Sequence, residues 1–166
     1  MLRRTFLAFC GALAFTSASA ASLPEPSGPV VLEVTGKIGV TNGPGVARFD
    51  QAMLEGLQSG IIRTSTPWHG RVVEFQGPYG AALLKAVEAR GSSLVLTALN
   101  DYSAEVPVSD ITRYNVIFAM KADNQYMRVR DRGPLMLIYP FDSQPELKSE
   151  VIHNRSVWQI KRIEIR

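Results

Sequence analysis

The sequence predicts one α+β domain with a mostly β core, and length, composition and the pattern of apolar residues support this prediction. The chain has 166 residues, enough for one domain with a buried core. Hydrophobic residues make up 46% and charged residues 20%, the balance of a globular rather than a disordered chain. Most apolar runs are short and end at Gly, Pro, Asn or Asp, as strands do, and only two stretches show helical spacing. No internal repeat divides the chain, so we expect a single domain over residues 30–166.

The first twenty residues have the pattern of an export signal. Arg3-Arg4 supplies a short positive region, Phe6 to Phe15 an apolar region, and Ala18-Ser19-Ala20 a small-residue cleavage site. The apolar region is too short to span a bilayer as a mature helix. The paired arginines also resemble a twin-arginine signal, so both export routes stay open. We therefore expect a periplasmic protein that begins with an extended lead-in over residues 21–29.

Removal of this signal changes which functions are plausible. It takes away Arg3-Arg4 and the single cysteine, Cys10, but no acidic residue, which leaves 16 basic against 15 acidic side chains. A net charge of +1 gives little support to nucleic-acid binding, so no nucleic-acid partner is expected. Without cysteine, the exported chain has no disulfide, no thiol nucleophile and no thiolate metal ligand.

In the first half of the chain, apolar runs and helical spacing alternate. The spacing predicts helices over Phe49–Leu57, with Asp50 as the N-cap, and over Ala81–Arg90, with Gly91 as the C-terminal cap. Strands are expected at Val30–Val34, Lys37–Thr41 and Arg71–Phe75.

The second half contains only strand-like runs. They are Leu94–Leu99, Ala104–Val108, Val116–Met120, Leu135–Tyr139 and Val157–Ile165. In the last of these, Trp158 and Ile160 share one parity, whereas Ile163 and Ile165 share the other. This change of phase predicts a β-bulge near Lys161.

Common catalytic motifs are absent from the sequence. It contains neither G-x-S-x-G nor H-E-x-x-H, and His69 and His153 have no second metal-ligand type at a recognisable spacing. We expect a surface or hydrogen-bonding role for both histidines, with no catalytic or metal-binding residues.

Two loops could nevertheless bind a small molecule. Trp68 lies in a polar loop between Pro67 and Gly70, where its indole would either stack on a flat ligand or cap the sheet. Asn100-Asp101 follows an apolar strand and is most simply a turn. In a pocket, however, the Asp101 carboxylate could accept two N–H bonds from an amino-amidine edge such as that of a pterin.

Three arginines alternate in the segment Arg128-x-Arg130-x-Arg132-Gly133-Pro134. If the segment is extended, all three guanidinium groups share one face. That face is either the solvated side of an edge strand or a site for an anion or acidic partner. Because Gly133-Pro134 fixes the next turn, Arg132 is the arginine expected to be held in place.

The order of four segments resembles the catalytic domain of the sulfite-oxidase family, whose fold binds the pterin of the molybdenum cofactor. These segments are Phe75–Leu84, Leu99–Pro107, Arg130–Pro140 and Val157–Glu164. The resemblance implies a sulfite-oxidase-like α+β fold with mixed sheets and a few short helices.

One departure from the family pattern is decisive for the cofactor. Catalytic members hold molybdenum through a cysteine in the loop before a W-x-G-v segment. Here that loop, Ile62 to His69, offers Thr64, Ser65 and Thr66. Because an alcohol is a poor substitute for a soft thiolate, the molybdenum cofactor is not expected.

A small exported branch of the family is more similar. Its members bind reduced pterins without molybdenum and regulate membrane enzymes that make and break cyclic di-GMP. The resemblance thus implies a non-catalytic, periplasmic protein with a reduced pterin as ligand and the periplasmic domain of a membrane signalling enzyme as partner. Trp68 and Tyr102 are expected to stack on or line the ring, Asp101 to bind the amino-amidine edge, and Arg132 to bind the carbonyl or side-chain hydroxyls. The alternatives are a molybdenum-cofactor oxidoreductase, or a subunit of one, and an interaction module with a vestigial pocket.

Overall fold

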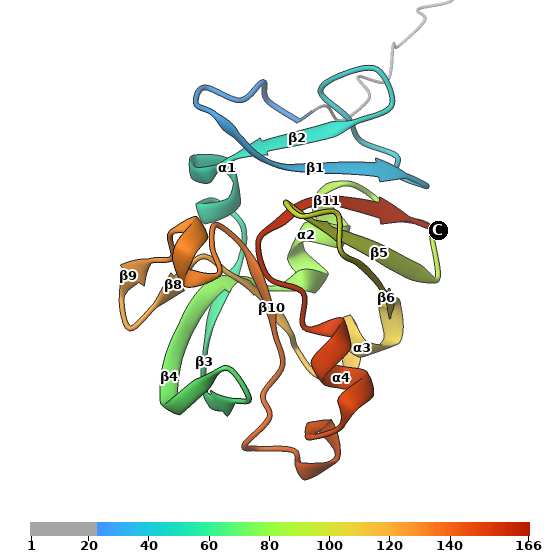
Figure 1. Cartoon of the computed structure of the whole chain (residues 1–166). Helices are drawn as coiled ribbons and strands as arrows, with labels where there is room; N and C mark the ends of the chain where they lie inside the picture. The colour runs from blue at the N-terminus through green and yellow to red at the C-terminus, as the bar shows by residue number, and fades with distance from the viewer. Residues whose placement is uncertain (1–22) are drawn as a thin grey trace, which may run out of the picture.

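A five-stranded sheet forms one side of the molecule (Figure 1). The computed structural model describes residues 23–166, so the predicted export signal and the start of the lead-in lie outside the described residues. The strand order is β2-β1-β11-β5-β6, in which β1 and β11 are parallel and the other neighbours antiparallel. The strands are β1 (Val30–Gly36), β2 (Ala47–Asp50), β5 (Ser93–Ala98), β6 (Ser103–Pro107) and β11 (Ile160–Ile165).

A four-stranded sheet lies on the other side, and a two-stranded pair runs between the two sheets (Figure 1). The four-stranded sheet contains β3 (Ser59–Thr66), β4 (His69–Pro78), β8 (Lys121–Ala122) and β9 (Gln125–Tyr126). The pair consists of β7 (Ile117–Ala119) and β10 (Met136–Ile138), which are antiparallel.

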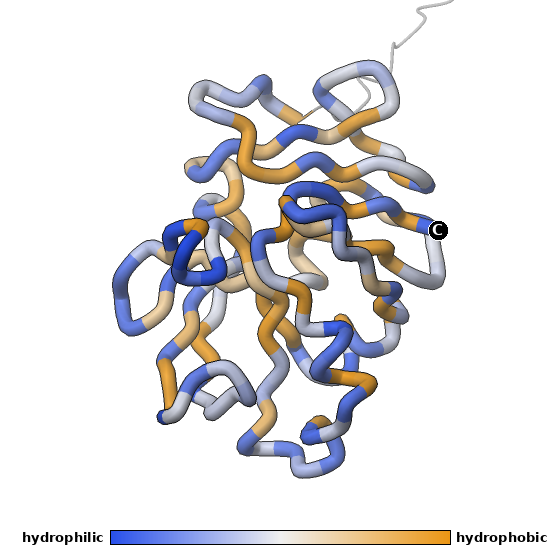
Figure 2. The backbone as a smooth tube through the Cα atoms, in the orientation of Figure 1, coloured by the Kyte–Doolittle hydropathy of each residue, from blue (hydrophilic) through white to orange (hydrophobic). Residues whose placement is uncertain are grey.

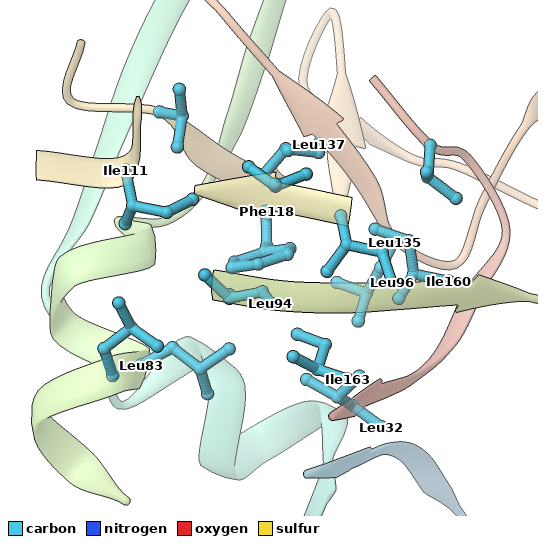
Figure 3. Packing of buried hydrophobic residues seen from close by; sticks show 14 of the residues in the cluster. Leu32, Leu83, Leu94, Leu96, Ile111, Phe118, Leu135, Leu137, Ile160 and Ile163 are labelled. Carbon is cyan, nitrogen blue, oxygen red and sulfur yellow. The ribbon is translucent and has the colours of Figure 1, made fainter. Parts of the chain in front are cut away.

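The β7–β10 pair is buried on both faces because it separates two hydrophobic clusters. Leu135 and Leu137 belong to the larger cluster, under the five-stranded sheet, whereas Met136 and Ile138 belong to the smaller one. Figure 3 shows Leu135, Leu137 and Phe118 packed over Leu94 and Leu96 of β5. A strand buried on both faces has a continuous apolar run, as 135–139 does.

Short helices close the ends of the strands. They are α1 (Gln51–Glu55), α2 (Gly80–Ala86), α3 (Val108–Arg113) and α4 (Glu150–Arg155), with 3₁₀ turns η1 (Val129–Asp131) and η2 (Pro145–Leu147). Figure 2 shows hydrophobic residues along the inner strands and a strongly hydrophilic loop at η1. No helix within residues 23–166 is long and apolar enough to cross a membrane.

Several sequence predictions are confirmed. The mixed sheets and short helices agree with the predicted α+β class. Asp50 is the N-cap of α1, and its carboxylate accepts the Met53 N–H at 2.9 Å. The pairing of β11 with β5 shifts register between Ile160 and Arg162, which is the predicted bulge at Lys161.

Other boundaries were wrong. The run Lys37–Thr41 is not a strand, because β1 ends at Gly36 with a positive φ of 88° and the chain leaves the sheet. The helix expected to continue to Arg90 ends at Ala86, and Gly91 does not cap it. A Cβ at Gly91 would lie 2.1 Å from the backbone oxygen of Arg166, so close approach to the C-terminal strand requires glycine there.

Other elements were missed or misread. Strand β3 covers most of the segment interpreted as a loop, α4 was not predicted, and Val108 begins α3 instead of ending a strand. Phe49 likewise lies in β2, which ends at Asp50, and is not part of the helix that follows. In each case tertiary contacts outweigh a weak local pattern.

Candidate functional site

A cavity of about 430 Å³ lies where three segments of the chain meet. The turn between β3 and β4 supplies Trp68, the turn after β5 supplies Asn100 and Tyr102, and α4 with the segment that follows supplies the opposite wall. This wall contains His153, Asn154, Ser156, Val157 and Trp158. The size and the apolar, aromatic lining suit a small flat molecule.

Two tryptophans and a histidine form the aromatic part of this cavity. The rings of Trp68 and Trp158 meet edge to face, with centroids 5.1 Å apart and an interplanar angle of 72°. Trp68 also meets His153 at 6.0 Å and 73°. Trp68 is half-buried against the smaller hydrophobic cluster, so its indole both lines the cavity and covers that cluster.

Tyr102 ties the turn after β5 to α4. Its hydroxyl donates to the Asn154 carbonyl at 3.0 Å, and its N–H donates to Asn100 Oδ1 at 3.2 Å. The side-chain amide of Asn100 is thereby oriented, with its NH₂ left to donate elsewhere. The structure thus brings Trp68 and Tyr102 to one cavity.

Asp101 lies in the same turn, but its side chain is not part of the cavity wall. Its backbone is left-handed, with φ 65°, and its carboxylate accepts a hydrogen bond from Lys161 Nζ at 2.7 Å. This hydrogen bond and the lysine charge hold the pKa of Asp101 below its usual value. With 83% of its side chain exposed, Asp101 faces solvent and Lys161.

The segment from Arg128 to Arg132 is not extended, so its three guanidinium groups do not share one face. Val129–Asp131 forms a 3₁₀ turn, and Arg132 follows in the left-handed conformation with φ 71°. The turn closes because the Gly133 N–H donates to the Arg128 carbonyl at 2.8 Å, which an extended chain cannot do.

Arg132 is nevertheless close to the aromatic residues. Its guanidinium carbon lies 5.8 Å from the centre of the Trp158 ring. Arg132 lines a second cavity of about 330 Å³, together with His69 of β4. A residue of the second cavity, Arg132, thus lies over the ring of a residue of the first, Trp158.

A buried polar cluster holds α4, and with it one wall of the first cavity. Asp110 of α3 accepts hydrogen bonds from the Tyr139 hydroxyl at 3.0 Å and from Arg155 of α4 at 2.9 Å. Burial, followed by the charge of Asp110, raises the pKa of Tyr139 well above its usual value. No spacing in the sequence connects these three residues, and sequence reasoning missed them.

Sequence reasoning also missed Trp158 and His153 as cavity residues. Trp158 was interpreted as part of the last strand, but β11 begins at Ile160, and Trp158 lies before it in an isolated bridge with Met136. His153 carries no signal of its own, since α4 was not predicted.

The segment that would carry a molybdenum ligand does not fit that metal. Thr64 Oγ1 accepts the Asp142 N–H at 3.1 Å, Ser65 Oγ donates to Asp142 Oδ1 at 2.6 Å, and Thr66 Oγ1 lies 2.7 Å from His69 Nδ1. All three hydroxyls are engaged, and none offers the soft thiolate that such a metal prefers. Within residues 23–166, no three His, Cys, Asp or Glu side chains come together as metal ligands.

Comparison with known proteins places the fold. No family model matches the sequence, and no curated protein matches it. Among solved structures, a chain of the sulfane dehydrogenase SoxCD from Paracoccus pantotrophus is similar, with a TM-score of 0.59 and 16% sequence identity. The chain has a sulfite-oxidase-like fold.

The similarity covers 81% of this chain and 37% of the SoxCD chain. At 16% identity it concerns the arrangement of the backbone. The chain thus corresponds to well under half of the dehydrogenase chain, and the activity of that enzyme does not follow for it.

Proposed function

We propose that this protein is a non-catalytic pterin-binding protein of the periplasm that regulates a membrane cyclic-di-GMP enzyme through its periplasmic domain. The observation that carries the pterin part is the aromatic cavity of about 430 Å³ between Trp68, Trp158 and Tyr102. A bicyclic ring is flat and polar at its edges, and aromatic walls with a few polar groups at the rim bind such rings.

Polar groups at the cavity rim complement the edge of a pterin. The Asn100 NH₂ can donate to a ring carbonyl, because Asn100 Oδ1 already accepts the Tyr102 N–H. Ser156, which is buried in the cavity wall, donates its hydroxyl hydrogen to the Ile152 carbonyl at 2.8 Å, so its oxygen can act toward a ligand only as an acceptor. Asp101 can bind the amino-amidine edge only by giving up its bond with Lys161.

The non-catalytic part of the proposal rests on the chemistry of β3. The hydroxyls of Thr64, Ser65 and Thr66 are engaged with protein groups, and residues 11–166 contain no cysteine. Export and the signalling partner rest on the N-terminal sequence pattern and on the family resemblance.

The identity of the bound molecule tests the proposal directly. We would purify the exported protein anaerobically from cells that also make molybdenum cofactor, and measure the absorbance and mass spectra of the extract and the molybdenum content. A stoichiometric pterin without molybdenum is expected. About one molybdenum per chain would instead establish the oxidoreductase, and failure to bind added reduced pterin would establish the vestigial pocket.

The partner is tested separately. The mature protein, with and without its pterin, would be mixed with the purified periplasmic domain of a membrane cyclic-di-GMP enzyme from the same cells. Association that depends on the pterin is expected, and association that is absent or independent of the pterin contradicts the regulatory part.

A further inference from the structure

Most residues that line the second cavity, of about 330 Å³, are charged or polar, whereas aromatic residues are prominent in the lining of the first. The second cavity lies between β4, the β8–β9 hairpin and the loop at η1, which adjoin in Figure 1. Its lining contains three arginines, two aspartates and a histidine, namely Arg71, Arg130, Arg132, Asp123, Asp131 and His69.

The charges of this cavity do not balance locally. Asp123 is paired with Arg71, and Asp131 is bound at 2.8 Å by Arg128, which is not part of the lining. Arg130 lies 3.8 Å from the same Asp131 oxygen. Among the described residues, Arg132 has no carboxylate within 4.0 Å, so the cavity keeps unpaired positive charge.

His69 adds a hydrogen-bond donor to this positive surface. Thr66 Oγ1 accepts the Trp68 N–H at 3.3 Å and can donate its own hydrogen to His69 Nδ1. The neutral ring then carries its proton on Nε2. Burial, and after it the charges of Arg132 and Arg71, keep the pKa of His69 below its usual value, while Asp123 acts in the opposite direction.

We propose that this second cavity binds a small oxyanion, of the phosphate, sulfate or carboxylate class, through Arg132, Arg130 and His69. Charge-assisted hydrogen bonds from guanidinium groups to such anions are among the strong ones. The anion is either free or the acidic group of a ligand whose ring occupies the first cavity, because Arg132 contacts Trp158 on one side and lines the second cavity on the other. Only the second source rests on the proposed pterin function.

Calorimetric titration of the pterin-free mature protein with inorganic phosphate or sulfate, against a chloride background, tests the free-anion source. Saturable binding is expected, with affinity at least about tenfold lower in Arg132→Ala, the loss of a charge-assisted bond. Arg90→Ala is the matched control, because it removes the same charge at a residue that pairs with Glu88 and is not part of the cavity lining.

A second arm tests the ligand source. If free anions do not bind, a pterin with a phosphate or carboxylate group should bind more tightly than the neutral pterin, and Arg132→Ala should abolish that difference. Absence of both effects overturns the proposal. If the wild-type protein binds phosphate but no pterin, the proposed function is overturned and the anion site is retained.

The pH dependence of sulfate binding tests whether His69 contributes to the anion site, since sulfate keeps its charge between pH 5 and 8. A bound anion offsets Arg132 and Arg71 and raises the pKa of His69, so binding takes up a proton and affinity rises as pH falls. His69→Gln should flatten this slope. A slope that is unchanged in His69→Gln overturns the assignment of His69 to the site.

Discussion

At the scale of single residues, the first cavity depends on side chains that serve the fold as well as the ligand. Trp68 covers the smaller hydrophobic cluster while it lines the cavity, and Tyr102 joins a turn to α4 through its hydroxyl. Residues with two roles require variants that separate stability from binding.

Substitution of Trp68 is the first such case. Trp68→Ala should weaken binding of a reduced pterin by about 1–3 kcal/mol, the usual range for loss of a stacking ring. It should also lower the melting temperature without unfolding the protein, because the indole is half-buried at the edge of the smaller cluster. Trp68→Phe should retain most of the affinity, and unchanged affinity in Trp68→Ala would assign the indole to capping alone. Fluorescence titration and thermal melts provide both readouts.

The pair Asp101 and Lys161 tests which partner the carboxylate prefers. If Asp101 binds the pterin edge, Asp101→Asn should weaken pterin binding about tenfold, and Lys161→Met should strengthen it by freeing the carboxylate. Stability should hardly change in Asp101→Asn, because asparagine tolerates the left-handed backbone at φ 65°. Titration calorimetry decides: equal affinity in all three proteins means that Asp101 is only a turn residue.

At the scale of elements, two carboxylates fix segments that local sequence patterns do not. Asp110 joins α3 to α4 through Arg155, and Asp50 joins the lead-in to α1. The Asp50 cap of α1 is local, but the bonds of Asp50 to Ser27 and Gly28 and those of Asp110 join segments distant in the sequence, so these bonds depend on the tertiary structure.

Loss of Asp110 should loosen α4 and the cavity wall that it carries. Asp110→Ala leaves the Arg155 charge and the Tyr139 hydroxyl without their acceptor, which should cost about 3 kcal/mol of unfolding free energy. Pterin affinity should fall as well, because the cavity residues His153 and Asn154 lie on α4 and Trp158 follows shortly after it. Thr112→Ala, on the same helix, is the control and should change neither urea denaturation nor ligand titration appreciably. Normal affinity in a destabilised Asp110→Ala protein would show that α4 is held by other contacts.

Asp50 should make stability depend on pH in the acidic range. Its carboxylate accepts the N–H groups of Met53 at 2.9 Å, Gly28 at 2.8 Å and Ser27 at 2.7 Å, and these bonds lower its pKa below the unfolded value. A lowered folded pKa means that the contribution is complete above the unfolded pKa of about 4 and is lost as pH falls through the folded pKa. Melting temperatures between pH 7 and pH 2.5 should therefore differ between wild type and Asp50→Asn at neutral pH and converge at low pH. A difference that is constant over this range contradicts the assignment.

At the scale of the whole molecule, the β7–β10 pair joins the two hydrophobic clusters, because it contributes side chains to both of them. Leu137 and Ile138 are neighbours in β10, but they face the larger and the smaller cluster respectively. Loops and short elements around this shared centre line both cavities, so the packing of the two sheets fixes the positions of their lining residues.

This arrangement predicts a single unfolding transition. Leu137→Ala and Ile138→Ala should each cost about 2–5 kcal/mol, the usual range for a large-to-alanine change in a core. Far-ultraviolet circular dichroism and tryptophan fluorescence should give coincident denaturation curves in both variants, because neither cluster can open alone. Two separated transitions in Ile138→Ala would mean that the smaller cluster unfolds independently.

Local sequence patterns predicted the α+β class, most strands, the Asp50 cap, the bulge at Lys161 and two of the residues at the first cavity, Trp68 and Tyr102. These features depend on local patterns: apolar alternation, capping chemistry and aromatic residues in loops. Three pairings were visible only once the chain was folded: Asp101 binds Lys161, Arg132 of the second cavity lies over Trp158 of the first, and Asp110 binds Arg155 of α4. Each of these pairings joins residues far apart in the chain. The packing of the two sheets sets which residues meet in these pairings, and no spacing along the sequence encodes that packing.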